Sequence, residues 1–149
     1  MRQTYPIVLA TLVIGAFLAQ DASAQDAASL EAAVMDYYDK LNNEDVGSSD
    51  YFLPDADQFP RTGLVLTALN DDETEEFESG LDFEVELHHL NATVIGETGI
   101  ATYYTTGTTT YPDGVVLRGT FRASAIAVWQ GRQWRIAHFH LSQLKTMPE

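Results

Sequence analysis

Cysteine is absent from this sequence, and basic residues are scarce. Without cysteine the chain cannot form disulfides, thiolate metal sites or the lipidated N-terminus of a lipoprotein, so its stability must come from packing. Lysine and arginine number 8 against 22 aspartate and glutamate residues, which gives a formal net charge of −14. No Lys or Arg occurs between Arg61 and Arg118. This charge argues against nucleic acid and against anionic lipid surfaces as partners.

A long apolar run is also missing, apart from a short one near the N-terminus. Arg2 precedes the apolar segment Ile7–Leu18, and small residues follow at Ala22-Ser23-Ala24. This order is typical of a secretory signal peptide, and the segment is shorter than the roughly 20 residues of a membrane span. We therefore expect cleavage near Ala24, a periplasmic or secreted location, and no membrane association after cleavage. The chain then consists of a signal, residues 1–24, and a single domain, residues 25–149.

Two helices are predicted in the first half of this domain. Apolar residues recur at helical spacing after Asp26, a good N-cap, and indicate a helix up to Asn43. Its inward stripe is expected to consist of Leu30, Val34, Tyr37 and Leu41. The segment 47–63 contains prolines and glycines and is expected to be irregular. The acidic run Asn70–Ser79 has the capping pattern of a short helix.

From Leu81 onward the pattern of apolar residues changes from helical to alternating. Four strands are expected, over residues 81–95, 98–111, 117–130 and 133–144. Turn-forming residues separate these strands at Gly96-Glu97, Tyr111–Gly114 and Gly131-Arg132. The order of elements predicts an α+β domain, in which N-terminal helices cover one face of a curved antiparallel sheet.

Two of the four histidines, His138 and His140, lie two residues apart in the last predicted strand. With a two-residue turn at Gly131-Arg132, strict alternation puts both histidines opposite alanines of the preceding strand. The shared face is expected to carry Ala123, Ala125, Ala127 and Trp129 beside Trp134, Ile136, His138 and His140. Small residues beside polar ones indicate unfilled space, so this face is expected to line a cavity on the covered side of the sheet.

The hairpin at Gly96-Glu97 is expected to contribute to the same cavity. Strict pairing from that turn places His89 opposite Tyr104 and Asn91 opposite Thr102. The apolar residues Phe83, Val85 and Leu87 mark the buried side of this hairpin. The covered face would therefore also carry His89, Asn91, Tyr104 and Thr106. His88 would point outward.

The stretch "VWQGRQWRIAHFHLS" resembles the last hairpin of SnoaL-like domains and of the association (hub) domain of calcium/calmodulin-dependent kinase. In these domains a tryptophan is followed by a His-x-His-x-Ser run, which is matched here by Trp134, His138, His140 and Ser142. The stretches "VIGETGIATY" and "LNNEDVGSSDYFLPDADQF" are similar to other parts of the same domains. The resemblance extends from Ala27 to Lys145. It implies the nuclear-transport-factor-2-like fold, a cystatin-like cone-shaped roll that encloses a pocket and forms dimers through the outer face of its sheet.

The functions implied by this resemblance are diverse. They include steroid isomerases, dehydratases, polyketide cyclases and non-catalytic oligomerisation domains, so the fold does not define the chemistry. The pocket arginines of the hub domain are matched here by Thr106 and Ala127. The helix tyrosine of the isomerases is matched by Tyr37, but no buried pair of carboxylates is evident in the sequence.

Three functions remain open for the predicted pocket. The first is a dimeric module that binds an unknown small molecule. Its ligand-binding residues would be His89, Asn91, Tyr104, Thr106, Ala125, Trp129, Trp134, His138 and His140. The second is a cofactor-free lyase or isomerase, in which His138 or His140 exchanges a proton with the help of Tyr37 or Tyr104. The third is a purely structural oligomerisation domain, with the histidines hydrogen-bonded inside it.

The spacing of the histidines also suggests a metal site. Zinc would accept His89, His138 and His140 together with a water molecule. No carboxylate or cysteine is expected beside these three residues, however. We therefore expect neither a metal nor any other cofactor.

Overall fold

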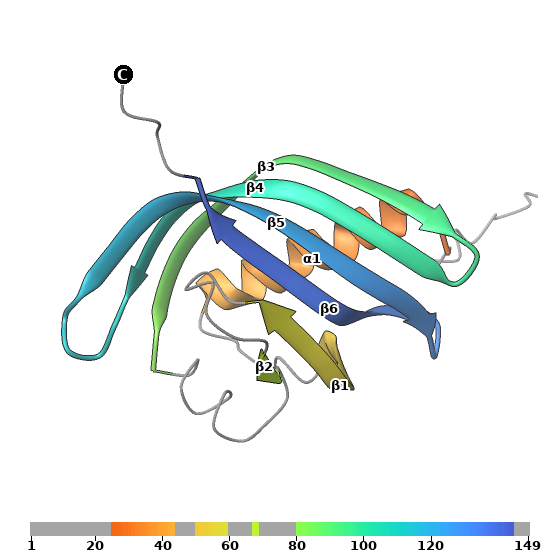
Figure 1. Ribbon diagram of the computed structural model, residues 1–149, viewed down its shortest axis with the longest axis horizontal. Coiled ribbons are helices and arrows are strands. Elements are labelled where there is room, and N and C mark those ends of the chain that lie inside the picture. Colours follow the sequence, from red (N-terminus) through yellow and green to blue (C-terminus); the bar gives the residue numbers. More distant parts are fainter. Residues whose placement is uncertain (1–24, 44–49, 60–66, 69–79, 145–149) are drawn as a thin grey trace, which may run out of the picture.

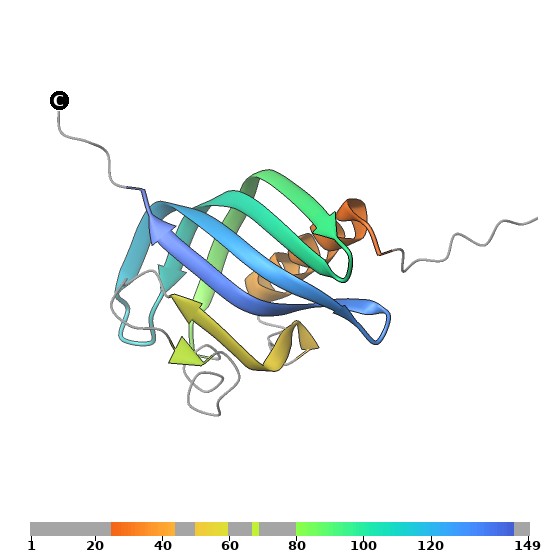
Figure 2. The same ribbon diagram turned by 45° about the vertical axis from the view of Figure 1, so that its right-hand side comes forward.

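The computed structural model describes residues 25–43, 50–59, 67–68 and 80–144, which form one helix beside a six-stranded sheet (Figure 1). The elements are α1 (Ala27–Asn42), β1 (Phe52–Phe59), β2 (Thr67–Ala68), β3 (Asp82–Ile95), β4 (Thr98–Thr110), β5 (Val116–Gln130) and β6 (Gln133–Gln143). The strand order is β2-β1-β6-β5-β4-β3. The long strands bend around the side on which α1 lies (Figure 2), which confirms the predicted α+β class and curved sheet.

Two of the predicted segments, the signal at residues 1–24 and the helix Asn70–Ser79, lie outside the described residues. Among the residues that are described, no helix has the length and apolar character needed to cross a membrane.

Helix α1 begins at a reciprocal cap. The Asp26 carboxylate accepts a hydrogen bond from the Ser29 amide at 2.8 Å, and the Asp26 amide donates to the Ser29 hydroxyl at 3.2 Å. The buried residues of the helix are Leu30, Val34, Tyr38 and Leu41. Tyr38 thus takes the place that was predicted for Tyr37. Both fit the helical spacing, but Tyr38 lies toward β4, where its ring packs 5.7 Å from that of Tyr103.

Strand β1 corrects the prediction that segment 47–63 is irregular. It runs parallel to β6, so the sheet is mixed rather than purely antiparallel. The pairing is interrupted between Phe52 and Asp57, where Pro54 has no amide hydrogen to donate. The proline gives the segment its loop-like sequence. Burial of Phe52 and Ala56 nevertheless holds it against the sheet.

All three predicted turns are confirmed. Gly96-Glu97 and Gly131-Arg132 form two-residue loops between neighbouring antiparallel strands. Gly131 and Arg132 have φ angles of 62° and 67°, the left-handed pair that a type I′ turn requires. In the remaining turn, the amide of Gly114 donates to the carbonyl of Tyr111 at 2.9 Å.

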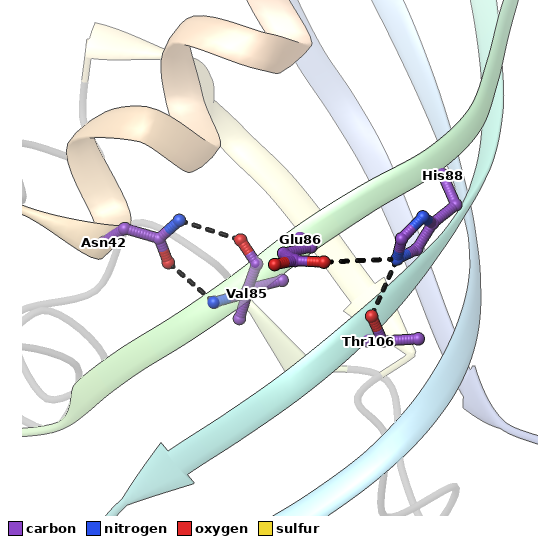
Figure 3. A network of polar contacts seen from close by, with 5 residues as sticks. All are labelled: Asn42, Val85, Glu86, His88 and Thr106. Atoms are coloured by element: carbon purple, nitrogen blue, oxygen red, sulfur yellow. Dashed lines mark hydrogen bonds and ion pairs between the residues drawn. The ribbon is translucent and has the colours of Figure 1, made fainter.

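The core lies between α1 and the face of the sheet that α1 covers, which we name the inner face. It is formed by small and aromatic residues of the long strands: Ala101, Tyr103, Ala123, Ala125, Ala127, Trp134 and Phe139. Gly99 allows the closest approach of the helix, since a Cβ there would lie 2.5 Å from Cδ2 of Leu30. The end of α1 is fixed to β3. The Asn42 side chain donates to the Val85 carbonyl at 2.8 Å and accepts from the Val85 amide at 2.9 Å (Figure 3).

Candidate functional site

A β-bulge in β6 reverses the expected orientation of its two histidines. Ala127 pairs with Ile136, as strict alternation predicts, but the next residue, Ile126, pairs with His138. Ala137 is therefore an extra residue, and the side chains that follow it change faces. One inserted residue is enough to exchange every inner and outer position in the rest of the strand.

The prediction that His138 and His140 face alanines on the covered side is therefore wrong. Both histidines lie on the face away from α1, which we name the outer face. Phe139 takes the inner position, opposite Ala125, and is buried. Burial explains why the bulged register forms. The bulge removes the aromatic ring of Phe139 from water and leaves the two imidazole rings near the solvent.

A second bulge, in β3, has the same effect on the other hairpin. Asn91 pairs with Thr102 as predicted, but His88 rather than His89 pairs with Tyr104. The backbone of His89 has a φ of 54°, in the left-handed region. The four residues that were expected on the covered side lie instead on the outer face: His89, Asn91, Tyr104 and Thr106. The bulge between residues 88 and 91 shifts the alternation that Phe83, Val85 and Leu87 establish.

The hydroxyl of Thr106 forms a hydrogen bond with the side chain of a residue in the neighbouring strand. Nε2 of His88 lies 2.7 Å from Oγ1 of Thr106 and 3.9 Å from the Glu86 carboxylate (Figure 3). His88 points outward, as predicted. This contact joins β3 to β4, which gives Thr106 a structural partner.

The remaining predicted site residues lie on the inner side: Tyr37, Ala125, Trp129 and Trp134. Nε1 of Trp134 donates to the Ser29 hydroxyl at 2.8 Å, and the two tryptophan rings are 5.2 Å apart. Both tryptophans line a hollow of about 300 Å³ beside α1. The ring of Tyr37 packs against Tyr51, at 5.5 Å. The sheet therefore separates Tyr37 from the two histidines that were to act with it.

Tyrosines on the inner side form a cluster that the sequence did not reveal. Tyr38 and Tyr103 are buried, and their hydroxyl groups form a hydrogen bond. Burial raises the pKa of Tyr38 to about 12, against a smaller lowering by the hydrogen bond from Tyr103. Burial also raises the pKa of Tyr103 well above its ordinary value. Both phenols therefore remain protonated and hold α1 to β4 as a neutral pair.

Asp57 is a second residue that the sequence did not reveal, because β1 was not predicted. Its Oδ1 lies 2.5 Å from Nδ1 of His138, its register partner in β6. The side chains of Asp57 and His138 are 41% and 28% exposed. The ring of Phe59 lies 5.7 Å from that of His138 and 6.1 Å from that of His140. A carboxylate on Nδ1 orients an imidazole and leaves its other nitrogen for proton exchange.

The outer face contains a hollow of about 290 Å³, which we name the outer hollow. It is lined by His89, Thr102, Tyr103, Tyr104, Arg122, Ala123, Ser124 and His140. Three predicted ligand-binding residues, His89, Tyr104 and His140, thus come together, although on the unexpected side of the sheet. Arg122 and Ser124 were not among the predicted site residues, because their alternation with the alanines of β5 puts them on the face opposite the expected cavity.

Metal binding has no support in the described part of the chain. There, no group of three or more His, Asp or Glu side chains is arranged to hold a metal ion. His138 is engaged by Asp57, and His89 and His140 belong to strands separated by β4 and β5.

Comparison with known proteins identifies the family of the chain and solved structures that share its fold. The sequence profile of the SnoaL-like domain matches residues 30–146, and no protein of curated function matches the chain. An NTF2-like protein from Cytophaga hutchinsonii shares 14% sequence identity over 77% of this chain and 95% of that chain, with a TM-score of 0.67. The association domain of C. elegans CaMKII shares 14% over 76% and 92%, with a TM-score of 0.61. The S. rosetta CaMKII hub shares 17% over 79% and 96%, with a TM-score of 0.63. These identities show a common fold.

Proposed function

The chain belongs to the SnoaL-like domain family, and on this premise we propose that it is a homodimeric association module, joined through the outer face of its sheet. The observation that carries this proposal is an apolar band across β4 and β5. Ile100 and Ile126 pair directly and are 42% and 39% exposed, and Val128 continues the band. No helix among the described residues covers this band, whereas α1 covers the inner face. Exposed apolar surface of this kind is typical of an interface.

The distribution of charge favours a second copy as the partner. A formal net charge of −14 opposes the approach of two copies in most orientations. The strands β4, β5 and β6, however, contain no Asp or Glu. Contact between two copies through these three strands therefore places no strand carboxylate of one copy against a carboxylate in the same strands of the other. A two-fold axis through the band sets Ile126 of one copy against the same band of the other.

The similarity in fold to proteins named as an association domain and a hub agrees with this proposal. A stable dimer buries about 800 Å² of each partner, an area that the outer face of three long strands can supply. The apolar band would form the centre of such an interface, with Arg122 and His140 nearer its rim.

The mass of the protein in solution tests the proposal. We expect residues 25–149 to sediment as a dimer in analytical ultracentrifugation. Ile126→Glu should give monomers, because it places two charges at the two-fold axis. Met35→Glu is the matched control: Met35 is 58% exposed on α1, so this variant should stay dimeric. A monomeric wild type at the highest concentration tested, or a dimeric Ile126→Glu, would contradict the proposal.

A second candidate function is cofactor-free acid–base catalysis, which the contact between Asp57 and His138 favours. The carboxylate orients the imidazole on the outer face, where the ring is partly exposed. Of the two tyrosines considered as its helper, Tyr104 is on the same face as His138, whereas Tyr37 is on the other side of the sheet. If a substrate screen finds lyase or isomerase turnover, His138→Gln should lower kcat by about 10²-fold or more. Unchanged turnover in that variant would exclude His138 as the base.

Export is part of the proposed function. The support is the charged start, apolar segment and small residues of the first 24 positions. Sequencing of the N-terminus of the protein from periplasm or medium should find Gln25 first. A protein that keeps Met1 and stays in the cytoplasm would contradict export.

A further inference from the structure

We propose that the outer hollow binds a small organic acid, whose carboxylate is held by Arg122. This goes beyond the proposed association, since the lining of the hollow comes from one copy of the chain. The hollow occupies the polar end of the outer face. Along β4 and β5 the pairs that follow Ile100 and Ile126 on this face are Thr102 with Ser124 and Tyr104 with Arg122.

The guanidinium of Arg122 is held in place, and no carboxylate in the described part of the chain neutralises it. Its Nε donates to the hydroxyl of Ser142, its register partner in β6, at 2.9 Å. This bond sets the plane of the guanidinium against β6. Neither Nη atom has a protein partner among the described residues. Two parallel N–H groups on a planar fork match the two oxygens of a carboxylate.

The other polar groups of the outer hollow also suit an anion. Thr102, Ser124 and Tyr104 offer hydroxyl donors, and His89 and His140 offer ring nitrogens. Within the described residues, neither imidazole ring forms a hydrogen bond. Among the described residues no Asp or Glu lines the hollow, although the chain has 22 acidic residues against 8 basic ones. The protein as a whole is strongly negative, so a hollow with an arginine and no described carboxylate differs in sign from its surroundings. This difference favours a negatively charged ligand.

The shape of the hollow limits the size of the ligand. Thr102 and Ser124 pair directly and form a floor of small side chains. The ring of Tyr104 stands perpendicular to that of His89, with centroids 6.1 Å apart, and forms one wall. His89 reaches this position from the bulge in β3, with a left-handed backbone that is costly for a residue with a side chain. A volume of about 290 Å³ is at the small end of ligand pockets, and fits one ring or a short chain beside the carboxylate.

Isothermal titration with benzoate, at low ionic strength, tests this proposal. We expect saturable binding with one benzoate per chain. Arg122→Gln should weaken it by about tenfold or more, the effect of losing a charge-assisted pair of hydrogen bonds. Arg118→Gln is the matched control. Arg118 is also exposed and in β5, but it lies outside the hollow, so its loss should change affinity by about twofold at most.

Three further measurements decide between the outcomes. Benzamide, which has the shape of benzoate without its charge, should bind at least about tenfold more weakly. Amide shifts in NMR spectra should concentrate at the residues that line the hollow. The titration is repeated on Ile126→Glu, so that failure of the proposed dimer and failure of the anion site are seen separately. Absence of saturable binding in both proteins, or equal weakening by Arg122→Gln and Arg118→Gln, would overturn the proposal.

Discussion

The two faces of the sheet are built from alternate residues of the same strands, yet they differ in almost every property. The inner face carries alanines and aromatic rings that are buried against α1, and its tyrosines stay neutral because burial raises their pKa. The outer face carries hydroxyls, imidazoles, arginines and exposed isoleucines. The alanines are therefore not a sign of empty space. They make room for aromatic rings from other positions, while the groups able to bind a partner lie on the opposite side.

Phe139 and His140 give the largest expected contrast between the faces. Phe139→Ala removes a buried ring and should lower the free energy of unfolding by about 3–5 kcal/mol. His140→Ala, one residue further on the outer face, should change it by about 0.5 kcal/mol or less. Urea unfolding of both variants provides the measurement. If the two costs were equal, the faces would not be separated as described.

Alkaline pH should remove stability that comes from the inner face. The pKa of Tyr38 is 10.0 in an unfolded chain and about 12 in the folded one, so folding favours the protonated phenol. This stabilisation is complete below pH 10 and is lost as the pH rises from 10 to about 12. The loss amounts to roughly 3 kcal/mol. Unfolding curves over this range should be less pH-dependent for Tyr38→Phe than for the wild type. If Tyr38→Phe and the wild type showed the same pH dependence of unfolding, the buried phenol of Tyr38 would not be the source of the lost stability.

Enlarged side chains should have a moderate effect that depends on the face. Ala101 is fully buried, so Ala101→Leu should overpack the core and lower the free energy of unfolding by about 1–3 kcal/mol. Thr102→Leu places the same side chain on the outer face, where space is open, and should cost about 0.5 kcal/mol or less. Thermal unfolding of the two variants compares them directly. A larger cost for Thr102→Leu than for Ala101→Leu would mean that Thr102, rather than Ala101, is packed in the core.

The smallest expected effect concerns the pair on the outer face. Asp57→Asn keeps the size of the side chain but removes its charge, and should lower the free energy of unfolding by about 1 kcal/mol or less. The NMR signals of the His138 ring should nevertheless change, because Nδ1 loses its carboxylate partner. An unchanged His138 spectrum would show that the contact does not form in solution.

The hairpins of the fold could be predicted because two-residue turns have strict backbone requirements. Gly96 and Gly131 adopt the left-handed φ angles that such turns need, and the registers next to both turns follow from them. The family was predicted from the stretch around Trp134, and the profile match confirms it. The inward stripe of α1 was correct except that Tyr38 replaces Tyr37.

The orientation of the site residues could not be derived from alternation alone. A single extra residue, Ala137, reverses the faces beyond it, and no glycine or proline marks the bulge. One signal was available: strict alternation after Ile136 would expose Phe139 and bury His138. The burial of an aromatic ring favours the opposite arrangement. Asp57 was missed for a different reason, because Pro54 makes a strand resemble a loop.

The register of His138 is the most direct test of the account, since the outer hollow and the contact with Asp57 depend on the bulge in β6. In NMR spectra of protein with labelled methyl groups, the ring protons of His138 should show nuclear Overhauser effects to the methyl groups of Ile126, its partner on the outer face. Effects to the methyl group of Ala125 instead would place His138 on the inner face beside α1, and would contradict the account.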